Sequence, residues 1–189
     1  MKVLLVEPPR ETWELMGTCV SPPLGLAQLA AVLEAAGIEV DIIDCNASGI
    51  GWQALDEIIE RSQSNIIGAT ATTPFFYDAL RVMEIAKKIS PDIVTVLGGP
   101  HVTFTIEETL CQHPEIDVIV RGEGEQALLE LARCYEKDSN LSHVKGIAFR
   151  DGQEVILTPP QPRVSSIIVT ILAYHLLPME KYYFTVFGK

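Results

Sequence analysis

The sequence has no cluster of closely spaced cysteines. Its four cysteines are Cys19, Cys45, Cys111 and Cys134, and no two of them form a CxxC or CxxxCxxC motif. This spacing excludes an iron–sulfur or structural zinc site built from these residues alone. It is also unlike a secreted disulfide framework, which a chain of 189 residues does not need. We therefore expect reduced thiols, most of them buried.

Positive charge is scarce, because 14 lysines and arginines face 25 aspartates and glutamates, for a net charge of −11. Proteins that bind nucleic acid set rows of cations against the phosphates, so we expect no nucleic-acid partner. Long hydrophobic runs are missing too. The residues before Glu7-Pro8-Pro9 are too few for a signal-peptide core, and 167–177 is about half as long as a membrane span. We expect a cytoplasmic protein without membrane contact.

What the chain does contain is an alternation of short β-branched runs with helical patterns. The runs predicted as strands are Val3–Val6, Glu39–Asp44, Ile66–Ala71, Ile93–Leu97 and Val118–Val120. Helices are expected over 22–36, 51–63, 105–111 and 124–135, and over a stretch that Thr73 caps and that ends near Ile89. Five such units predict an α/β fold. It is flavodoxin-like (Rossmann-like), with a doubly wound, five-stranded parallel sheet of strand order 2-1-3-4-5.

Beyond this fold, Ile147–Arg150 and Glu154–Leu157 flank Asp151-Gly152, which predicts a β-hairpin. We expect an α/β domain over 1–145, a hairpin extension over 146–163 and a connector over 164–189. The helix after Pro22-Pro23 is apolar on nearly all sides. Such a helix is usually covered on both sides, so we expect a second domain or a partner subunit to pack there.

Two glycine turns mark the expected binding edge. Gly98-Gly99-Pro100-His101 follows one predicted strand, and Gly122-Glu123-Gly124 follows the next. Ligands of doubly wound sheets bind beyond the carboxyl ends of the strands, and glycine lets a bulky group approach the backbone. Each turn has a plainer interpretation as a tight connection or a helix cap. The common nucleotide motifs are missing: GxGxxG does not follow the first strand, and there is no P-loop.

The chain resembles the N-terminal cobalamin-binding domain of the B12-dependent radical SAM enzymes. The matching segments are Pro22-Pro23-Leu24-Gly25-Leu26, the GGPH of Gly98 to His101, and the DVIVRGEGE of Asp117 to Glu125. Thr158-Pro159-Pro160 and the stretch from Leu177 to Tyr182 are similar to the connector that precedes a radical SAM barrel. The CxxxCxxC motif of that barrel is not present, so the chain is either truncated before it or a free-standing relative.

The resemblance implies that cobalamin spreads its corrin ring over the strand ends and pushes its nucleotide tail into a cleft beside the sheet. The residues expected to bind it are Ser21, Pro22, Leu24, Thr70, Thr72, Thr73, Gly98, Gly99, Pro100, His101, Gly122, Glu123 and Gly124. No DxHxxG motif follows the first strand. We therefore expect base-off cobalamin without a histidine lower ligand, its lower face left to loop residues between Glu7 and Val20.

The implied activity is methyl transfer from S-adenosylmethionine through methylcobalamin. The radical chemistry, with its second S-adenosylmethionine and its [4Fe-4S] cluster, belongs to the absent domain. This chain alone is therefore expected to be inactive, with no catalytic residue and no protein ligand to a metal. A ring-forming relative remains an alternative to a methyltransferase. So do a free-standing corrinoid carrier that docks on separate enzymes and a module that senses another small ligand.

Overall fold

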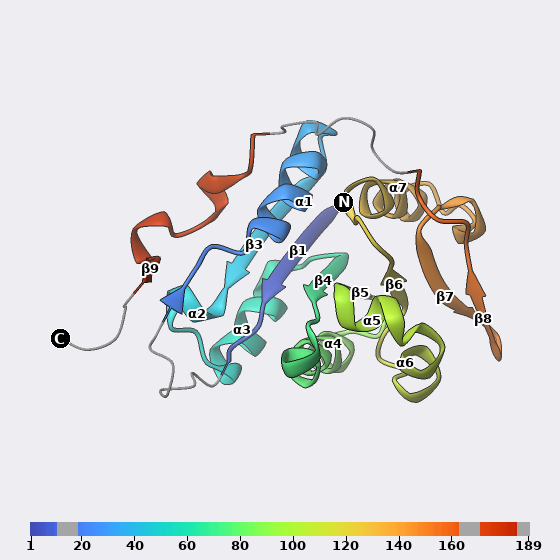
Figure 1. The fold of residues 1–189 in the computed structure, drawn as a ribbon, viewed down its shortest axis with the longest axis horizontal. Coiled ribbons are helices and arrows are strands. Elements are labelled where there is room, and N and C mark those ends of the chain that lie inside the picture. The colour runs from blue at the N-terminus through green and yellow to red at the C-terminus, as the bar shows by residue number, and fades with distance from the viewer. Residues whose placement is uncertain (11–18, 163–170, 185–189) are drawn as a thin grey trace.

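The computed structural model describes residues 1–10, 19–162 and 171–184 of the chain. Its main sheet has seven strands in the order β3-β1-β4-β5-β6-β7-β8 (Figure 1). Their bounds are β1 Lys2–Glu7, β3 Glu39–Asp44, β4 Ile66–Thr70, β5 Val94–Gly98, β6 Val118–Val120, β7 Ile147–Asp151 and β8 Glu154–Leu157. The first five in this order are parallel, and β7 and β8 are antiparallel.

The predicted order 2-1-3-4-5 is confirmed for the parallel strands. The five predicted parallel strands and the predicted hairpin are both present, and the hairpin of β7 and β8 continues the same sheet beyond β6, which gives seven strands in all. The edge of β6 still offers backbone hydrogen-bonding groups, and β7 pairs with them from Val118 to Val120. An unpaired edge would have been exposed there, so the hairpin completes the sheet.

Helices form a layer on each side of the sheet (Figure 1). Helices α1 (Leu24–Ala35) and α7 (Glu125–Glu136) lie on one face. The other face carries α3 (Trp52–Ser62), α4 (Phe76–Ile89) and α6 (Ile106–Gln112). Two short helices, α2 (Cys45–Ser48) and α5 (Pro100–Phe104), were not predicted from the sequence. Each is about one turn long, too short to show a helical period of apolar residues.

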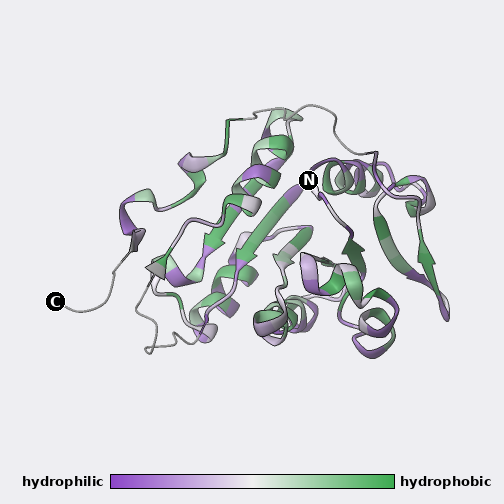
Figure 2. Ribbon diagram, in the orientation of Figure 1, coloured by the Kyte–Doolittle hydropathy of each residue, from purple (hydrophilic) through white to green (hydrophobic). Residues whose placement is uncertain are grey.

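The side chains of β1 are buried on both faces of the sheet, as expected of a central strand. Leu4 and Leu5 are each 1% exposed, although successive side chains of a strand point to opposite faces. Leu5 joins the core under α1 and α7, whereas Leu4 joins the core over α3 and α4. A strand covered on both faces needs a continuous apolar run, and Figure 2 shows the central strands as mostly hydrophobic ribbon.

Helix α4 begins later than predicted. Residues Thr73–Phe75 form a 3₁₀ turn, η2, and the α-helix starts at Phe76. The prediction that Thr73 caps this helix is wrong, since the residue before Phe76 is Phe75 and no side chain caps the helix. Pro74 within the turn has no N–H to donate, and this favours a short tight turn before the regular helix.

A segment of the same chain covers the outer side of α1. It contains the 3₁₀ turns η4 (Tyr174–Leu176) and η5 (Met179–Lys181) and the strand β9 (Tyr183–Phe184), which pairs with β2 (Cys19–Val20). Ala173 and Leu177 of this segment are buried in the core that α1 shares. The Ala173 N–H donates to the Ala27 carbonyl at 3.2 Å. Residues 171–184 of the same chain therefore cover part of the apolar surface of α1, where we expected a second domain or a partner subunit.

Polar contacts fix the two ends of this covering segment, which we call the connector strap (residues 171–184). The His175 ring lies 2.9 Å from the Glu34 carboxylate on α1, and the Tyr182 hydroxyl donates to Asp44 at 3.0 Å. Asp44 is 3% exposed and ends β3. The strap thus links α1 to the carboxyl end of the sheet.

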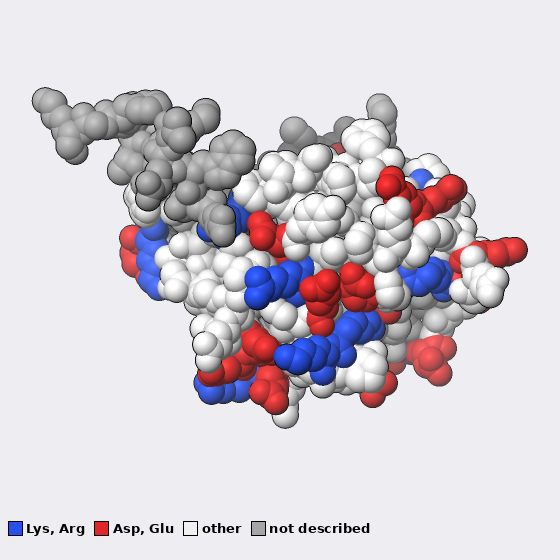
Figure 3. All heavy atoms as spheres, turned by 90° about the horizontal axis from the view of Figure 1, so that it is seen from below, with Lys and Arg blue, Asp and Glu red and all other residues white. Residues whose placement is uncertain are grey.

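The opposite side of the molecule carries mixed charge. Figure 3 views the molecule from below, where α3, α4 and α6 lie in Figure 1, and shows acidic and basic side chains interspersed there. No single-sign basic region gathers on the described part of this face. Within the described ranges, no helix is both long enough and apolar enough to cross a membrane.

Tyr182→Phe tests the anchoring of the strap. The substitution removes one hydrogen bond, but Asp44 keeps the bonds it accepts from the Asn46 and Ala47 N–H groups. We expect the free energy of unfolding in urea to fall by about 1 kcal/mol. Tyr174→Phe is the control, because that residue is 39% exposed. Equal stability of the two variants would contradict this role for the hydroxyl.

Candidate functional site

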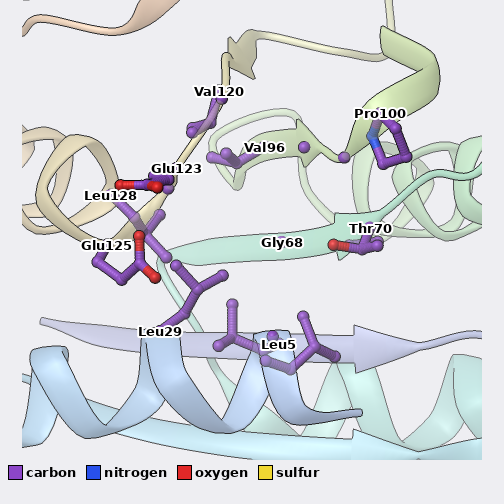
Figure 4. Close-up of a pocket in the computed structure, with 17 residues that line it drawn as sticks. Leu5, Leu29, Gly68, Thr70, Val96, Pro100, Val120, Glu123, Glu125 and Leu128 are labelled. Atoms are coloured by element: carbon purple, nitrogen blue, oxygen red, sulfur yellow. The ribbon is translucent and has the colours of Figure 1, made fainter. Parts of the chain in front are cut away.

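A cavity of about 310 Å³ opens at the carboxyl end of the sheet, on the face that carries α1 and α7 (Figure 4). Four neighbouring strands and the first turns of two helices contribute to it. The residues that line it are Leu5, Gly25, Leu26, Leu29, Gly68, Ala69, Thr70, Val96, Gly98, Gly99, Pro100, Val120, Gly122, Glu123, Gly124, Glu125 and Leu128. The cavity is therefore a wedge between the two helices and the sheet.

Gly68 in the middle of β4 gives the wedge its depth. A Cβ at this position would lie 3.0 Å from Leu5 Cδ2 and 3.8 Å from the Val96 carbonyl oxygen. Glycine weakens a strand interior and is typically found there where another group approaches the backbone. Leu5 and Val96 flank it on β1 and β5 as its partners in register. The floor is consequently bare backbone at Gly68, with the hydrocarbon side chain of Leu5 close beside it.

The two glycines at the end of β5, Gly98 and Gly99, have different structural roles. Gly98 lies in ordinary backbone conformation, and a Cβ there would meet only Val120 atoms at 3.9–4.0 Å. Gly99 has φ +102°, and its Cβ would lie 2.6 Å from the Ala71 carbonyl oxygen. Ala71 also bonds to both sides of the turn, donating to the Gly98 carbonyl and accepting from the His101 N–H. Gly98 keeps the cavity open, whereas Gly99 allows two strand-end loops to touch.

Polar groups gather at the mouth of the cavity. Thr70 ends β4, and Glu123 and Glu125 flank Gly124 where α7 begins (Figure 4). Glu123 is exposed and Glu125 half-buried. Carboxylates near a helix N-terminus complement its dipole, and they also accept hydrogen bonds from amide groups of a ligand. Among the described residues, those that line the cavity include no lysine, arginine or histidine.

The structure brings seven of the thirteen predicted site residues together around this cavity. They are Thr70, Gly98, Gly99, Pro100, Gly122, Glu123 and Gly124. The other six do not line it: Ser21, Pro22, Leu24, Thr72, Thr73 and His101. Leu24 starts α1 and is 48% exposed, while the next residue, Gly25, reaches the cavity.

His101 belongs to a different cluster. Its ring centroid lies 4.5 Å from that of Phe76 at the start of α4, and its Nδ1 is 3.3 Å from the Thr73 hydroxyl. The Thr72 hydroxyl is buried without a hydrogen-bond partner in the structure. Thr72 and Thr73 thus lie in the turn between β4 and α4, and His101 contacts this turn from α5.

Sequence reasoning missed ten of the residues that line the cavity. These are Leu5, Gly25, Leu26, Leu29, Gly68, Ala69, Val96, Val120, Glu125 and Leu128. For most of them the sequence offers no signal, because apolar residues that face a cavity have the same sequence pattern as apolar residues that face the core. Gly68 was the exception: an isolated glycine within a strand pattern is itself a sign that another group approaches closely.

Comparison with known proteins identifies the family. A family model for the B12 binding domain matches residues 19–132, which include both glycine turns and every cavity residue except Leu5. The chain belongs to the B12-binding domain family. The resemblance that the sequence showed is thereby confirmed.

Relatives of this B12-binding domain are longer proteins. An uncharacterized methyltransferase of Pyrococcus horikoshii is 41% identical over 96% of this chain and 40% of its own length. An anaerobic magnesium-protoporphyrin IX monomethyl ester cyclase of Rubrivivax gelatinosus is 36% identical over the whole chain and 35% of its own length. The chain thus spans about two fifths or less of the curated relatives it matches.

A solved structure of the same fold carries the cofactor. The cobalamin-dependent S-adenosylmethionine radical enzyme OxsB, with aqua-cobalamin and S-adenosylmethionine bound, superimposes with a TM-score of 0.73. It is 21% identical, and the match covers 85% of this chain and 22% of that one. At this identity the likeness establishes the fold of the B12-binding domain.

A second polar group lies at the ends of β1 and β3, outside the cavity. Arg10 forms an ion pair with Glu7, and its guanidinium lies 4.1 Å from the centre of the Phe75 ring. Asn46 accepts from the Arg10 N–H at 3.0 Å and donates to the Pro8 carbonyl at 2.9 Å. These contacts hold the first residues of the loop after β1. We assigned the lower face of the cofactor to the loop between Glu7 and Val20, of which residues 11–18 lie outside the described residues.

Burial sets the protonation of this group. Glu7 is 8% exposed, and burial raises the pKa of its carboxyl above the usual value, although the Arg10 charge opposes the shift. Burial and the nearby Asp44 carboxylate raise the pKa of the Cys45 thiol to about 12. A thiol with so high a pKa stays protonated at neutral pH, so Cys45 is an unreactive core residue.

Gly99→Ala tests the assignment of separate roles to the glycine pair. The added methyl group meets a backbone atom in a conformation that L-residues rarely adopt, so we expect the free energy of unfolding to fall by at least about 2 kcal/mol. Gly98→Ala is the matched control and should change it by less than about 1 kcal/mol. Chemical denaturation of both variants makes the comparison, and equal losses would contradict the division.

Proposed function

We propose that this chain is the cobalamin-binding part of a B12-dependent radical SAM enzyme, and that the enzyme is a methyltransferase. The observation that carries the proposal is the glycine-floored cavity at the carboxyl end of the sheet. When bound, cobalamin supplies a cobalt centre that carries a methyl group.

The cavity fits one part of the cofactor. Its volume of about 310 Å³ is at the lower end of the roughly 300–1,000 Å³ typical of ligand sites, which is too small for a whole corrinoid. It suits a narrow appendage such as the nucleotide tail. Gly98 leaves its place free of side chains, so the tail base can lie against the backbone of β5.

The mouth would hold the polar parts of the cofactor. Corrin rings carry peripheral amides, and the Glu123 and Glu125 carboxylates offer acceptors for their N–H groups. The Thr70 hydroxyl both donates and accepts. The first backbone N–H groups of α7, beside Gly124, suit the phosphate of the nucleotide loop.

We infer that cobalamin binds base-off and without a histidine lower ligand. None of the described residues that line the cavity is histidine, and the His101 ring packs against Phe76 instead. In this inference S-adenosylmethionine and a [4Fe-4S] cluster belong to a radical SAM domain, either on the same polypeptide or on a docking partner. The similarity to a methyltransferase over 96% of the chain supports methyl transfer.

Binding of hydroxocobalamin by the purified chain tests the proposal. We expect a corrin absorption band that survives desalting, and the Gly98→Val variant should weaken retention at least about tenfold because its side chain fills the cavity. Gly51→Val is the control, since Gly51 precedes α3 with open space around it and lies outside the cavity. Loss of the band in the unmodified chain would refute the function.

His101→Ala tests the inferred coordination. A histidine that ligates cobalt contributes to the visible spectrum, whereas His101 contacts Phe76 and Thr73. We therefore expect the spectrum of the bound cofactor to be the same with and without this imidazole. A shift of the corrin band in the variant, with retention unchanged, would show that His101 is a ligand.

A further inference from the structure

The lining of the cavity is apolar in its depth and polar at its mouth. Below the mouth, the side chains that line it are all hydrocarbon and come from both helices and from three strands: Leu5, Leu26, Leu29, Val96, Val120 and Leu128. The hydroxyl and carboxylate groups of the lining belong to Thr70, Glu123 and Glu125, at strand and loop ends. A group that enters to full depth therefore meets carbon on its flanks.

The backbone N–H and C=O groups of the floor are already hydrogen-bonded within the sheet. Strand β4 pairs with β1 on one side and with β5 on the other, so Gly68 is matched in register to both Leu5 and Val96. On the α7 side, the Leu128 N–H donates to the Gly124 carbonyl at 2.8 Å. An incoming polar edge would lose its water without gaining a partner, and this costs free energy.

We propose that this slot selects the base of the corrinoid tail and favours a benzimidazole over a purine. The inference rests on the proposed function, since it takes the tail to enter the cavity. A dimethylbenzimidazole presents ring carbons and methyl groups, which suit a hydrocarbon slot. An adenine base presents an exocyclic amine and additional ring nitrogens, which the floor and flanks leave unpaired. Both bases are flat aromatic rings, so discrimination comes from polarity rather than from size.

Equilibrium dialysis of the unmodified chain against three corrinoids tests the inference. They are cobalamin, its analogue with adenine as the tail base, and cobinamide, which lacks the nucleotide. We expect cobalamin to bind at least about tenfold more tightly than the adenine analogue. This factor corresponds to the free-energy cost of burying one or two polar groups of adenine without hydrogen-bond partners. We also expect cobinamide to bind more weakly than cobalamin.

Each outcome has a separate meaning. Equal affinity for cobalamin and the adenine analogue, or tighter binding of the analogue, overturns the selection while leaving the proposed function intact. Equal affinity for cobalamin and cobinamide also overturns it, because the base then does not reach the slot. If none of the three binds, the proposed function itself fails.

A pair of variants locates the selection in the slot. Val96→Thr keeps the side-chain shape but places a hydroxyl on the floor, and we expect it to reduce the preference for cobalamin over the adenine analogue at least threefold. Val118→Thr is the matched control, because Val118 is the register partner of Val96 on β6 and is buried but does not line the cavity. If both variants change the preference for cobalamin equally, the selection does not arise from the lining of this cavity.

Discussion

The site depends on how α1 and α7 meet the sheet on either side of β4, where Gly68 presents no side chain to them. A larger residue at this position would press against Leu5, which lies 3.0 Å from the place of its Cβ. Protein interiors are otherwise filled to high density, so a gap of about 310 Å³ at the end of a sheet requires such an omission. The glycines at the strand ends widen the opening, and the polar residues are confined to the rim.

The strap of residues 171–184 buries apolar surface of α1 that the sheet does not cover. Because α1 is apolar on most sides, the sheet alone cannot bury it, and Ala173 and Leu177 cover part of the remainder. The strap also ends in contact with the cavity's side of the sheet through Tyr182 and Asp44. The helix that forms one wall of the cavity is thereby held from both sides, which fixes the width of the wedge.

Much of the fold followed from local patterns. The strands were predictable because central parallel strands need continuous apolar runs, and the hairpin because Asp-Gly between two alternating runs favours a tight turn. The strand order was the common solution for this architecture, and it is confirmed. The short helices α2 and α5 and the start of α4 were missed or misplaced, since a single turn carries too few residues for periodicity to register.

The sequence by itself determined the β–α alternation, the glycine turns at the binding edge and the family to which the chain belongs, because each of these is encoded in neighbouring residues. Only the tertiary structure decided that Gly98 keeps the cavity open while Gly99 allows the close approach to Ala71, and that His101 contacts Phe76. It also decided that the floor is bare backbone at Gly68, with the hydrocarbon side chain of Leu5 close beside it. The physical reason is that a side chain's surroundings depend on residues brought close by strand register and helix contact, which are far apart along the chain.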